Sequence, residues 1–360
     1  MSRRIIISVS NDLSTDQRVL KVADSLYKNG FDVTLIGRKL KNSQPLQLNY
    51  PYKRIRLIFN RSFLFYFELN LRLLFALLFS KANIFYANDT DTLPANFVAS
   101  KIKGSKLVFD AHELFPEVPE LQDRPVVQKI WIAIENWIFP HLTTSFTVCN
   151  SIAAYYNRKY QIKMHVLRNV PYKQVPSKKR LHFENTKIIL YQGALNVGRG
   201  LEWVIDAMPY IDHAILYIIG DGDIREQLMQ KVKKLDLQTK VIFHGKVPGK
   251  ELYTYTSSGD IGLCLLENKG LSYYYALPNR VFSYLHAGVP ILASPFPEIE
   301  QIVKTHHTGV LTQDYQPRNL AKTINEMLEF PQNTDHFKDL KDLFCWEEEE
   351  KILLAVMNAC

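Results

Sequence analysis

Residues 4–36 of the chain read RIIISVSNDLSTDQRVLKVADSLYKNGFDVTLI, and this stretch decides the fold. The apolar run Arg4–Val9 predicts a buried strand. The loop after it leads to a predicted helix that starts at Ser14, with Gln17 three residues on as a capping box. A second strand is predicted at Phe31–Ile36. A strand, a helix and a second strand in this order predict a parallel βαβ unit.

The same alternation continues along the chain. We expect strands at Ile84–Ala87, Lys106–Asp110 and Thr144–Cys149, with helices between them. After a polar stretch it restarts, with strands expected at Lys187–Tyr191, Ala214–Ile219, Lys240–Phe243, Asp260–Leu266 and Val289–Ala293. The helices expected there are Leu201–Met208, Asp223–Leu235, Asn279–Ala287, Pro297–Lys304 and Pro317–Phe330. The prediction is an α/β protein with two doubly wound, parallel-sheet, Rossmann-like domains.

The chain has 360 residues, enough for two cores. The predicted domains are 1–172 and 187–335, joined by a linker at 173–186. Residues 336–360 form a C-terminal segment with a last helix at Trp346–Met357. In doubly wound domains ligands bind at the carboxyl ends of the strands, so we expect the two domains to face a shared cleft.

Composition excludes several classes of protein. With 47% hydrophobic and 22% charged residues, the chain is neither disordered nor collagen-like. The apolar run near the first residue is too short for a signal-peptide core. The four cysteines are too dispersed for a zinc site and too few for a disulfide framework: Cys149, Cys264, Cys345 and Cys360. A reducing, cytoplasmic setting is the expectation.

Charge is divided unevenly along the chain. Residues 1–172 hold 23 Lys/Arg against 13 Asp/Glu, a balance of +10, while residues 173–360 hold 21 against 23, a balance of −2. A basic half indicates a polyanionic partner, either nucleic acid or an anionic membrane surface. No nucleic-acid-binding module accompanies the charge, so nucleic acid is not expected. A generally basic surface kept for solubility remains the alternative.

The most apolar stretch is Phe63–Phe79. It contains Glu68 and Arg72, so it is not a membrane-spanning helix. Its basic flanks suit a helix lying in a membrane interface: Arg56, Arg61 and Lys81. The alternative, which we favour, is a helix buried between the sheet and its neighbours. In that case Glu68 and Arg72 would pair at i and i+4 on an exposed edge.

Glycine-bearing turns mark the ends of strands in the second domain. The first is YQGALNVGRG at 191–200, where Gly193, Asn196 and Arg199 lie between a strand and a helix. Free backbone N–H groups and a guanidinium would meet an anion there. The second is IGDG at 219–222, and its alternative interpretation is a simple tight turn.

A third turn, LPNR at 277–280, places Asn279 and Arg280 at a helix start, with Ser283 one turn on. It is a second corner suited to a phosphate. Two such corners in one domain favour a diphosphate ligand.

Together these motifs, followed by AGVP at 287–290, resemble the donor half of family 4 retaining glycosyltransferases, which have the GT-B architecture. The first half agrees, with DQRV at 16–19, NDTDTL at 88–93 and DAHEL at 110–114. The resemblance covers nearly the whole chain. It implies a nucleotide-diphosphate sugar donor, a glycan or lipid-linked acceptor, and a final helix that returns to the first domain. It also implies transfer without a protein nucleophile.

The chain departs from the family at the donor loop and at the paired glutamates. The family's Arg and Lys of the first donor loop fall at Ala194 and Arg199, and its two glutamates fall at Tyr275 and Ser283. We therefore expect a variant subgroup in which Arg199 and Arg280 stabilise the leaving diphosphate. The donor-binding residues expected around them are Gly193, Asn196, Gly220, Gly222, Asn279 and Ser283.

The resemblance also assigns acceptor-side residues. His112 matches the family's acceptor-side histidine, expected to bind the transferred sugar; its alternative is a cap on the strand end. Glu113 would position the acceptor hydroxyl or pair with a base, and Asp16 would face the cleft or serve the helix dipole. Asp89 belongs to an Asp-x-Asp pattern, yet it lies away from the phosphate corners. We expect acceptor contact or helix capping there and no metal.

The leading prediction is a retaining, metal-independent glycosyltransferase that uses no cofactor beyond its nucleotide-sugar co-substrate. His112, Arg199 and Arg280 are its expected catalytic residues. Its expected place is cell-surface polysaccharide assembly, in the cytoplasm and peripherally on the inner membrane face. Two alternatives stay open: a nucleotide-sugar-binding relative without turnover, and a nucleotide-sugar epimerase of the same architecture.

Overall fold

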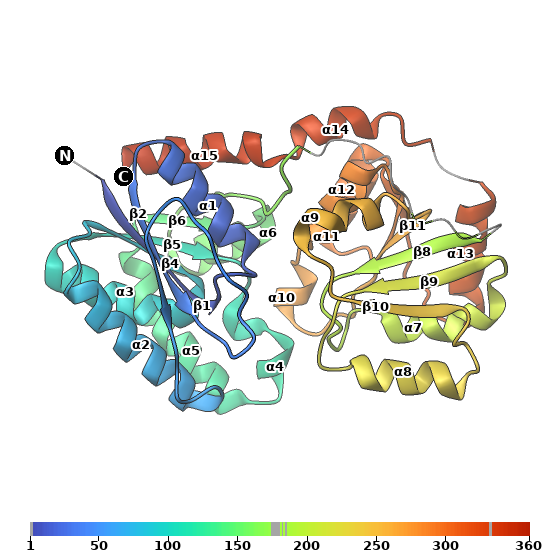
Figure 1. Cartoon of the computed structure of the whole chain (residues 1–360), viewed down its shortest axis with the longest axis horizontal. Helices are drawn as coiled ribbons and strands as arrows, with labels where there is room; N and C mark the ends of the chain where they lie inside the picture. The colour runs from blue at the N-terminus through green and yellow to red at the C-terminus, as the bar shows by residue number, and fades with distance from the viewer. Residues whose placement is uncertain (1–2, 174–180, 182, 184–185, 331–332) are drawn as a thin grey trace. The chain divides into compact units, whose positions relative to one another are not determined.

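A computed structural model describes residues 3–173, 181, 183, 186–330 and 333–360 (Figure 1). The chain forms two units. The first holds the chain up to Asn169 together with Glu349–Cys360, and the second holds Val170–Glu348. Most of the expected linker, namely residues 174–180, 182 and 184–185, lies outside the described residues.

The first unit is built on a seven-stranded parallel sheet in the order β3-β2-β1-β4-β5-β6-β7. Its strands are β1 (Arg4–Asp12), β2 (Asp32–Arg38), β3 (Tyr52–Ile55), β4 (Ile84–Asn88), β5 (Lys106–Ala111), β6 (Thr144–Thr147) and β7 (Met164–Val166). Successive strands run outward from β1 in one direction, and the order then reverses at β4. The carboxyl ends of β1 and β4 therefore form a topological switch point, where doubly wound sheets bind ligands.

Helices cover both faces of this sheet. The long helices α2 (Ser62–Leu78), α3 (Asp89–Lys103) and α5 (Pro125–Ile138) cover one face, where α3 packs against both of the others (Figure 1). The other face carries α1 (Gln17–Lys28) and the C-terminal part of α15 (Trp346–Ala359). The remaining helices are α4 (Pro119–Gln122) and α6 (Asn150–Tyr160).

The last helix is tied to the first unit by a buried carboxylate. The Oε2 atom of Glu349 accepts a hydrogen bond of 2.7 Å from the backbone N–H of Arg168, and its Oε1 atom lies 3.0 Å from the guanidinium of the same residue. Leu353 and Met357 on the same helix are fully buried. The end of the chain is thus part of the first unit's core.

The second unit has a six-stranded parallel sheet in the order β10-β9-β8-β11-β12-β13. Its strands are β8 (Lys187–Gln192), β9 (Ala214–Ile219), β10 (Val241–Gly245), β11 (Ile261–Cys264), β12 (Ile291–Ala293) and β13 (Gly309–Leu311). The order reverses between β8 and β11, which places the switch point at the end of β8.

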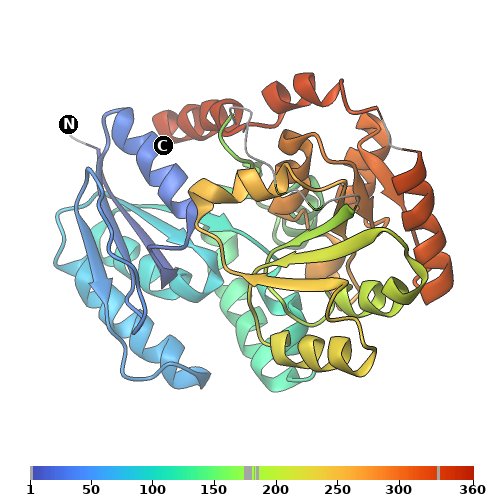
Figure 2. The ribbon, with the colours of Figure 1, turned by 45° about the vertical axis from the view of Figure 1, so that its right-hand side comes forward.

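The helices of the second unit also divide between two faces (Figure 2). They are α7 (Leu201–Ala207), α8 (Arg225–Lys234), α9 (Gly249–Thr256), α10 (Leu271–Tyr274), α11 (Asn279–Ala287), α12 (Pro297–His306), α13 (Pro317–Glu329) and α14 (Phe337–Leu343). The predicted fold class, two doubly wound parallel α/β domains, is confirmed.

The predicted start of α1 is wrong. The helix begins at Gln17, because the Asp12 carboxylate accepts hydrogen bonds from the backbone N–H (3.0 Å) and hydroxyl (2.9 Å) of Ser14 and holds the residues before the helix in a turn. Asp16 is the N-cap and accepts from the backbone N–H of Val19 at 3.2 Å. The capping box at Ser14 and Gln17 does not form.

The favoured interpretation of Phe63–Phe79 as a buried helix is only half right. One side of α2 packs into the core through Leu69, Leu73 and Leu77, while other large apolar residues of the helix are exposed. Glu68 pairs with Arg72 at 2.7 Å, but Glu68 is buried. Its carboxylate also accepts backbone N–H bonds from the turn before α2. Within the described residues, no helix is long and apolar enough to cross a membrane.

Candidate active site

In the first unit, His112 is held between two carboxylates at the carboxyl end of β5. Its backbone N–H donates to Asp89 Oδ1 at 2.9 Å, and its ring Nδ1 lies 3.0 Å from Asp89 Oδ2. Its Nε2 lies 3.6 Å from Asp110 Oδ2 and has no hydrogen-bond partner. The ring orientation is therefore set by Asp89, and Nε2 is turned toward Asp110.

The charge of this cluster follows from its burial and its pairs. Burial alone would lower the pKa of His112, but the carboxylates of Asp89 and Asp110 outweigh burial and raise that pKa well above the usual value. Burial would likewise raise the pKa of Asp110. The charges of Arg18 and His112 hold it well below the usual value instead. The two carboxylates therefore favour the imidazolium form of His112.

Arg18 anchors the cluster from α1. Its guanidinium donates to both oxygens of Asp110, at 3.0 and 2.7 Å, and to the carbonyl of Leu167 at 2.7 Å. Tyr86 donates a further hydrogen bond of 3.0 Å to Asp110. Arg18 and Asp110 stand inside the DQRV and DAHEL motifs, but the sequence pattern does not single them out. Their pairing across 92 positions appears only in the fold.

The acidic residues predicted on the acceptor side have different partners and positions in the structure. Asp89, at the start of α3 with φ of 59°, binds His112. Asp16 caps α1 and accepts from Asn11 Nδ2 at 3.1 Å, and Glu113 is exposed just past β5. Burial and the neighbouring charge of Asp89 raise the pKa of Asp91 to about 7. Within the described parts of the chain, no three His, Cys, Asp or Glu form a group that could hold a metal.

In the second unit, three glycines let the loops after β8 and β9 pack on each other. A Cβ on Gly220 would lie 1.8 Å from the carbonyl oxygen of Gly193. A Cβ on Gly222 would lie 2.5 Å from the carbonyl oxygen of Leu195 and 2.7 Å from Asn196 Oδ1. Gly220 and Gly222 therefore shape the loop that carries Gly193, rather than simply forming a tight turn.

Arg280 is a buried cation at the carboxyl end of β8. Its Nη1 donates to the Tyr191 hydroxyl at 3.1 Å, and its guanidinium carbon lies 4.8 Å from the centroid of the Tyr191 ring. A Cβ on Gly193 would come within 3.2 Å of the same Nη1. Among the described residues, the Nε and Nη2 atoms of Arg280 are buried without an oxygen or nitrogen acceptor, and the neighbouring polar group is the Cys264 thiol. Buried N–H donors of a charged group are costly unless an acceptor meets them.

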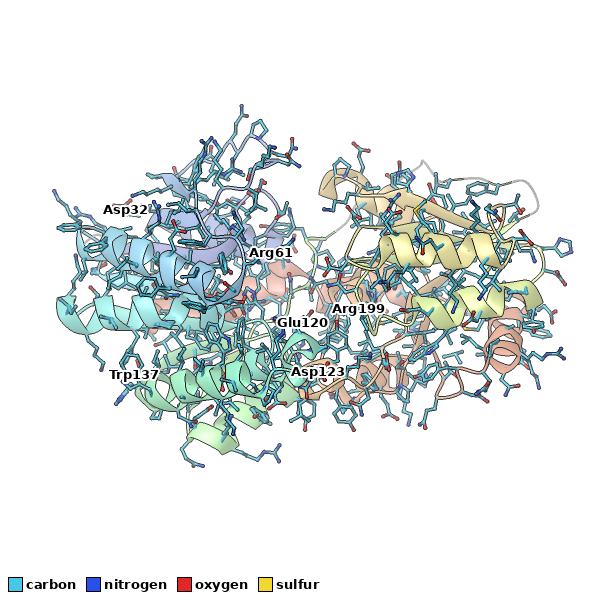
Figure 3. The ribbon with its side chains drawn as sticks, turned by 90° about the horizontal axis from the view of Figure 1, so that it is seen from below. Asp32, Arg61, Glu120, Asp123, Trp137 and Arg199 are labelled. Carbon is cyan, nitrogen blue, oxygen red and sulfur yellow. The ribbon has the colours of Figure 1, made fainter. Side chains whose placement is uncertain are left out.

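Arg199 repeats the arrangement on the neighbouring loop. It lies between Gly198 and Gly200, which adopt positive φ of 81° and 71°. Its guanidinium carbon is 4.5 Å from the centroid of the Tyr273 ring, and its Nε is buried without a hydrogen-bond partner. Two guanidiniums are thus each held on a tyrosine face (Figure 3 labels Arg199). The sequence analysis did not assign a role to the side chain of either tyrosine. The run of three tyrosines at Tyr273–Tyr275 was a signal for Tyr273.

The remaining predicted donor residues lie around this pair. Asn279 is the first residue of α11 and is exposed. The Ser283 hydroxyl donates to the backbone oxygen of Asn279 at 3.3 Å, inside the helix. Asn196 is half-buried beside Gly222. The structure therefore gathers the predicted donor residues on the loops after β8 and β9 and the start of α11.

Both units match known glycosyltransferase families. The model described as Glycosyltransferase Family 4 matches residues 16–170, and the model described as Glycosyl transferases group 1 matches residues 173–340. Each unit is therefore similar to a glycosyltransferase family, and together the two matches cover most of the chain.

The similar proteins are distant in sequence. An uncharacterized glycosyltransferase of Methanocaldococcus jannaschii is 27% identical over 177 residues, which is 47% of this chain and 44% of that protein. The chain spans less than half the length of the first three curated relatives it matches. A Campylobacter jejuni protein is 24% identical over 99% of this chain and 96% of its own. Its name gives it as an alpha-1,4-N-acetyl-D-galactosaminyltransferase acting on a GalNAc-GalNAc-diNAcBac chain on PP-undecaprenol.

Among solved structures, the HepE protein of Anabaena in complex with UDP and glucose has the same fold. It has a TM-score of 0.77 and 15% identity, with 99% of this chain and 100% of that chain covered. Identity at this level shows the shared fold alone.

Proposed function

We propose that this protein is a glycosyltransferase that moves a sugar from a nucleotide-diphosphate sugar to a glycan or lipid-linked acceptor. The observation that carries the proposal is the pair of tyrosine-stacked arginines in the second unit. Within the described residues, Arg199 keeps one buried N–H group, at Nε, and Arg280 keeps those of Nε and Nη2 without an oxygen or nitrogen acceptor. An anionic ligand with several oxygens would satisfy these groups and balance the two charges.

A diphosphate fits this arrangement better than a single carboxylate. Arg280 is the second residue of the helix α11. The first backbone N–H groups of a helix lack intrahelical partners and attract anions. Two guanidiniums on different loops suit a ligand with two phosphoryl groups. HepE, which shares the fold, was solved with UDP, and this supports a nucleoside diphosphate as the ligand class.

The residues then have separate chemical roles. Arg199 and Arg280 stabilise the negative charge that develops on the departing diphosphate, and such stabilisation is usually the largest catalytic contribution. In the first unit, Asp89 and Asp110 favour protonated His112, so we assign Nε2 a hydrogen bond donated to a sugar hydroxyl. A protonated imidazole held by two carboxylates is a poor nucleophile. We therefore propose that no covalent histidine intermediate forms; retention is proposed from the resemblance to the retaining family alone.

The acceptor is proposed from the same comparisons. The Campylobacter jejuni relative, aligned over almost all of both chains, is named for a PP-undecaprenol-linked acceptor. We propose a lipid-linked or glycan acceptor of that class, in cell-surface polysaccharide assembly, with no metal ion in the transfer step.

Isothermal titration of UDP, GDP, ADP and CMP tests the donor site. We expect one diphosphate to bind saturably. Arg199→Ala and Arg280→Ala should each weaken it by about tenfold to a hundredfold, because hydrogen bonds to charged groups contribute about 1.5–3 kcal/mol. The matching nucleoside should lose little affinity. Arg318→Ala is the matched control, since this exposed arginine also stacks on a tyrosine, at 5.1 Å from the Tyr210 ring centroid.

Equal loss of nucleoside and diphosphate affinity would show that these arginines do not contact the phosphates. If no nucleotide bound, the protein would be a relative of the glycosyltransferases that lacks a donor site. Once the nucleotide is known, incubating its sugar conjugates with and without acceptor separates two activities. Transfer releases nucleotide only with acceptor, whereas an epimerase changes the sugar without one.

A further inference from the structure

A stripe of large apolar side chains faces solvent along α2. Its members recur at every fourth residue, and this set is called the aromatic stripe: Phe63, Phe67, Leu71, Phe75 and Phe79. Their exposed fractions are 75%, 65%, 42%, 52% and 85%. Single exposed apolar residues are ordinary on soluble proteins, but a contiguous row of them marks an interaction surface.

Neighbouring helices extend this surface. On α5, Val126, Ile130 and Trp137 are more than half exposed, and on α3 Ile102 is 65% exposed. The three helices lie side by side on one face of the unit, with Trp137 at the outer edge (Figure 3). The rings of Tyr66 on α2 and Trp131 on α5 pack at 4.9 Å, which holds these helices together.

The fold does not need the aromatic stripe. The sheet side of α2 is already filled by Leu73 and Leu77, which pack with Phe85, Ala95 and Ala99 in the unit's core. The stripe residues point away from that core and contribute little to folding. Each exposed phenylalanine costs free energy in water that a covering partner would recover.

The charges on α2 and on the C-terminal part of α3 are mainly basic, whereas the segment that leads into α5 carries exposed Glu120 and Asp123. Residues 53–88 contain six basic residues: Lys53, Arg54, Arg56, Arg61, Arg72 and Lys81. Their single acidic residue, Glu68, is buried and bound to Arg72 and to the backbone N–H groups of Ile58 and Phe59. The segment 95–107 of α3 and β5 has no acidic residue and three lysines. An anionic partner is therefore complementary to α2 and the end of α3, whereas a second copy docked through α2 itself would set cations against cations.

We propose that the aromatic stripe docks the protein on an anionic lipid bilayer. The helix α2 has 17 residues and lies in the plane of the surface, with its phenylalanines below the phosphate level. Arg61 and Lys81 flank its two ends and Arg72, 44% exposed at its side chain, lies on it; all three contact lipid phosphates. This surface is separate from the donor chemistry. It agrees with a lipid-linked acceptor but does not depend on one.

Co-flotation of the full chain with vesicles tests the proposal. We expect binding to phosphatidylcholine vesicles that contain about one third phosphatidylglycerol, weaker binding to pure phosphatidylcholine, and release by salt. Phe67→Ser with Phe75→Ser should reduce binding about a hundredfold, since each buried phenylalanine contributes roughly tenfold or more. The control is Phe330→Ser, which alters a residue of the second unit that is 74% exposed.

A pair of charge-removing substitutions tests the electrostatic part of the proposal. Arg61→Gln with Lys81→Gln should weaken binding about tenfold or more and flatten its salt dependence, because each basic residue near the surface contributes about 1 kcal/mol. The control is Lys322→Gln with Lys338→Gln, two exposed lysines of the second unit.

Three results would overturn the docking surface. These are no vesicle binding by the wild type at low salt, unchanged binding by the double serine variant, or a wild-type dimer in light scattering that this variant loses. Titration of every variant with UDP, GDP, ADP and CMP in solution reports on folding and on the donor site. Vesicle binding without nucleotide binding would refute the proposed donor function alone, and the reverse result would refute the docking surface alone.

Discussion

At the scale of single residues, His112 shows how a pattern match becomes a chemical group. The DAHEL motif predicts a functional histidine, but its charge depends on Asp89 at the start of α3 and on Asp110 of β5, which lie on two sides of the ring. Because both carboxylates favour the imidazolium, the side chain is a hydrogen-bond donor at neutral pH and not a base. This distinction limits which mechanism the site can support.

The protonation of His112 can be measured by NMR titration of its ring. We expect its pKa to lie well above the ordinary value of about 6.5, and Asp89→Asn to lower it. Linkage gives the sign of the effect on stability. With a raised folded-state pKa, the contribution of His112 is complete below the unfolded pKa and is lost as pH rises through the folded pKa.

Urea unfolding of wild type and His112→Gln should therefore differ most at acidic pH, and the difference should shrink as pH rises. A difference that grows with pH would contradict the imidazolium assignment.

Gly220 is a second position where one atom decides the outcome. Its φ of 142° and the 1.8 Å between its would-be Cβ and the Gly193 carbonyl oxygen leave no room for a side chain. We expect Gly220→Ala to destabilise the second unit by about 2–4 kcal/mol and to weaken diphosphate binding, because the donor loop must move.

Gly245→Ala is the matched control for Gly220→Ala. Gly245 also has a positive φ, 88°, but nothing lies within 4 Å of its would-be Cβ. Its substitution should cost only about 1 kcal/mol in urea unfolding. Equal losses for the two variants would mean that backbone strain, not the loop contact, dominates.

At the scale of elements, the structure of α11 was predicted fully and that of α2 only in part. The bounds of α11 agree with the predicted helix at Asn279–Ala287, because Pro278 before it and Gly288 after it are strong local signals. The helix α2 was also placed well, but which of its sides is buried is decided by the sheet. In an almost continuous apolar run, polar residues do not recur with a helical period, so the sequence does not indicate which side of the helix faces solvent.

Short edge elements escaped prediction. The strands β3, β7 and β13 and the helices α9 and α14 are short, and β3 carries Lys53 and Arg54 in its four residues. Such segments lack a periodic apolar pattern of their own. Pairing with a neighbouring strand, or packing against α11 in the case of α9 and α14, decides their structure.

The final helix provides a prediction at this scale. Glu349 is nearly fully buried and bonds the backbone and guanidinium of Arg168. Glu349→Ala should lower the stability of the first unit by about 1–3 kcal/mol in urea unfolding, since the Arg168 groups lose their partner. Glu350→Ala, one position along the same helix and half-buried, is the control and should have little effect. Equal effects would place the stabilisation in the helix as a whole.

At the scale of the whole molecule, two sheets of the same kind carry different chemistry. In the first unit, the carboxyl ends of β4 and β5 carry carboxylates and His112. In the second unit, the loops after β8 and β9 and the start of α11 carry two arginines and three glycines. Such a division suits a reaction with two dissimilar ligands. Each set is local to its own unit, so each can be probed by its own variants.

The sequence by itself determined the alternation of strands and helices, the glycine turns at strand ends and the basic first half, because these depend on near neighbours in the chain and on composition. The tertiary structure alone decided that His112 meets Asp89, that Arg18 meets Asp110 and that Arg280 stacks on Tyr191. These partners are separated by 23 to 92 positions, so only the packing of the sheets brings them together. The same holds for the aromatic stripe, since exposure belongs to the folded surface and not to the residue.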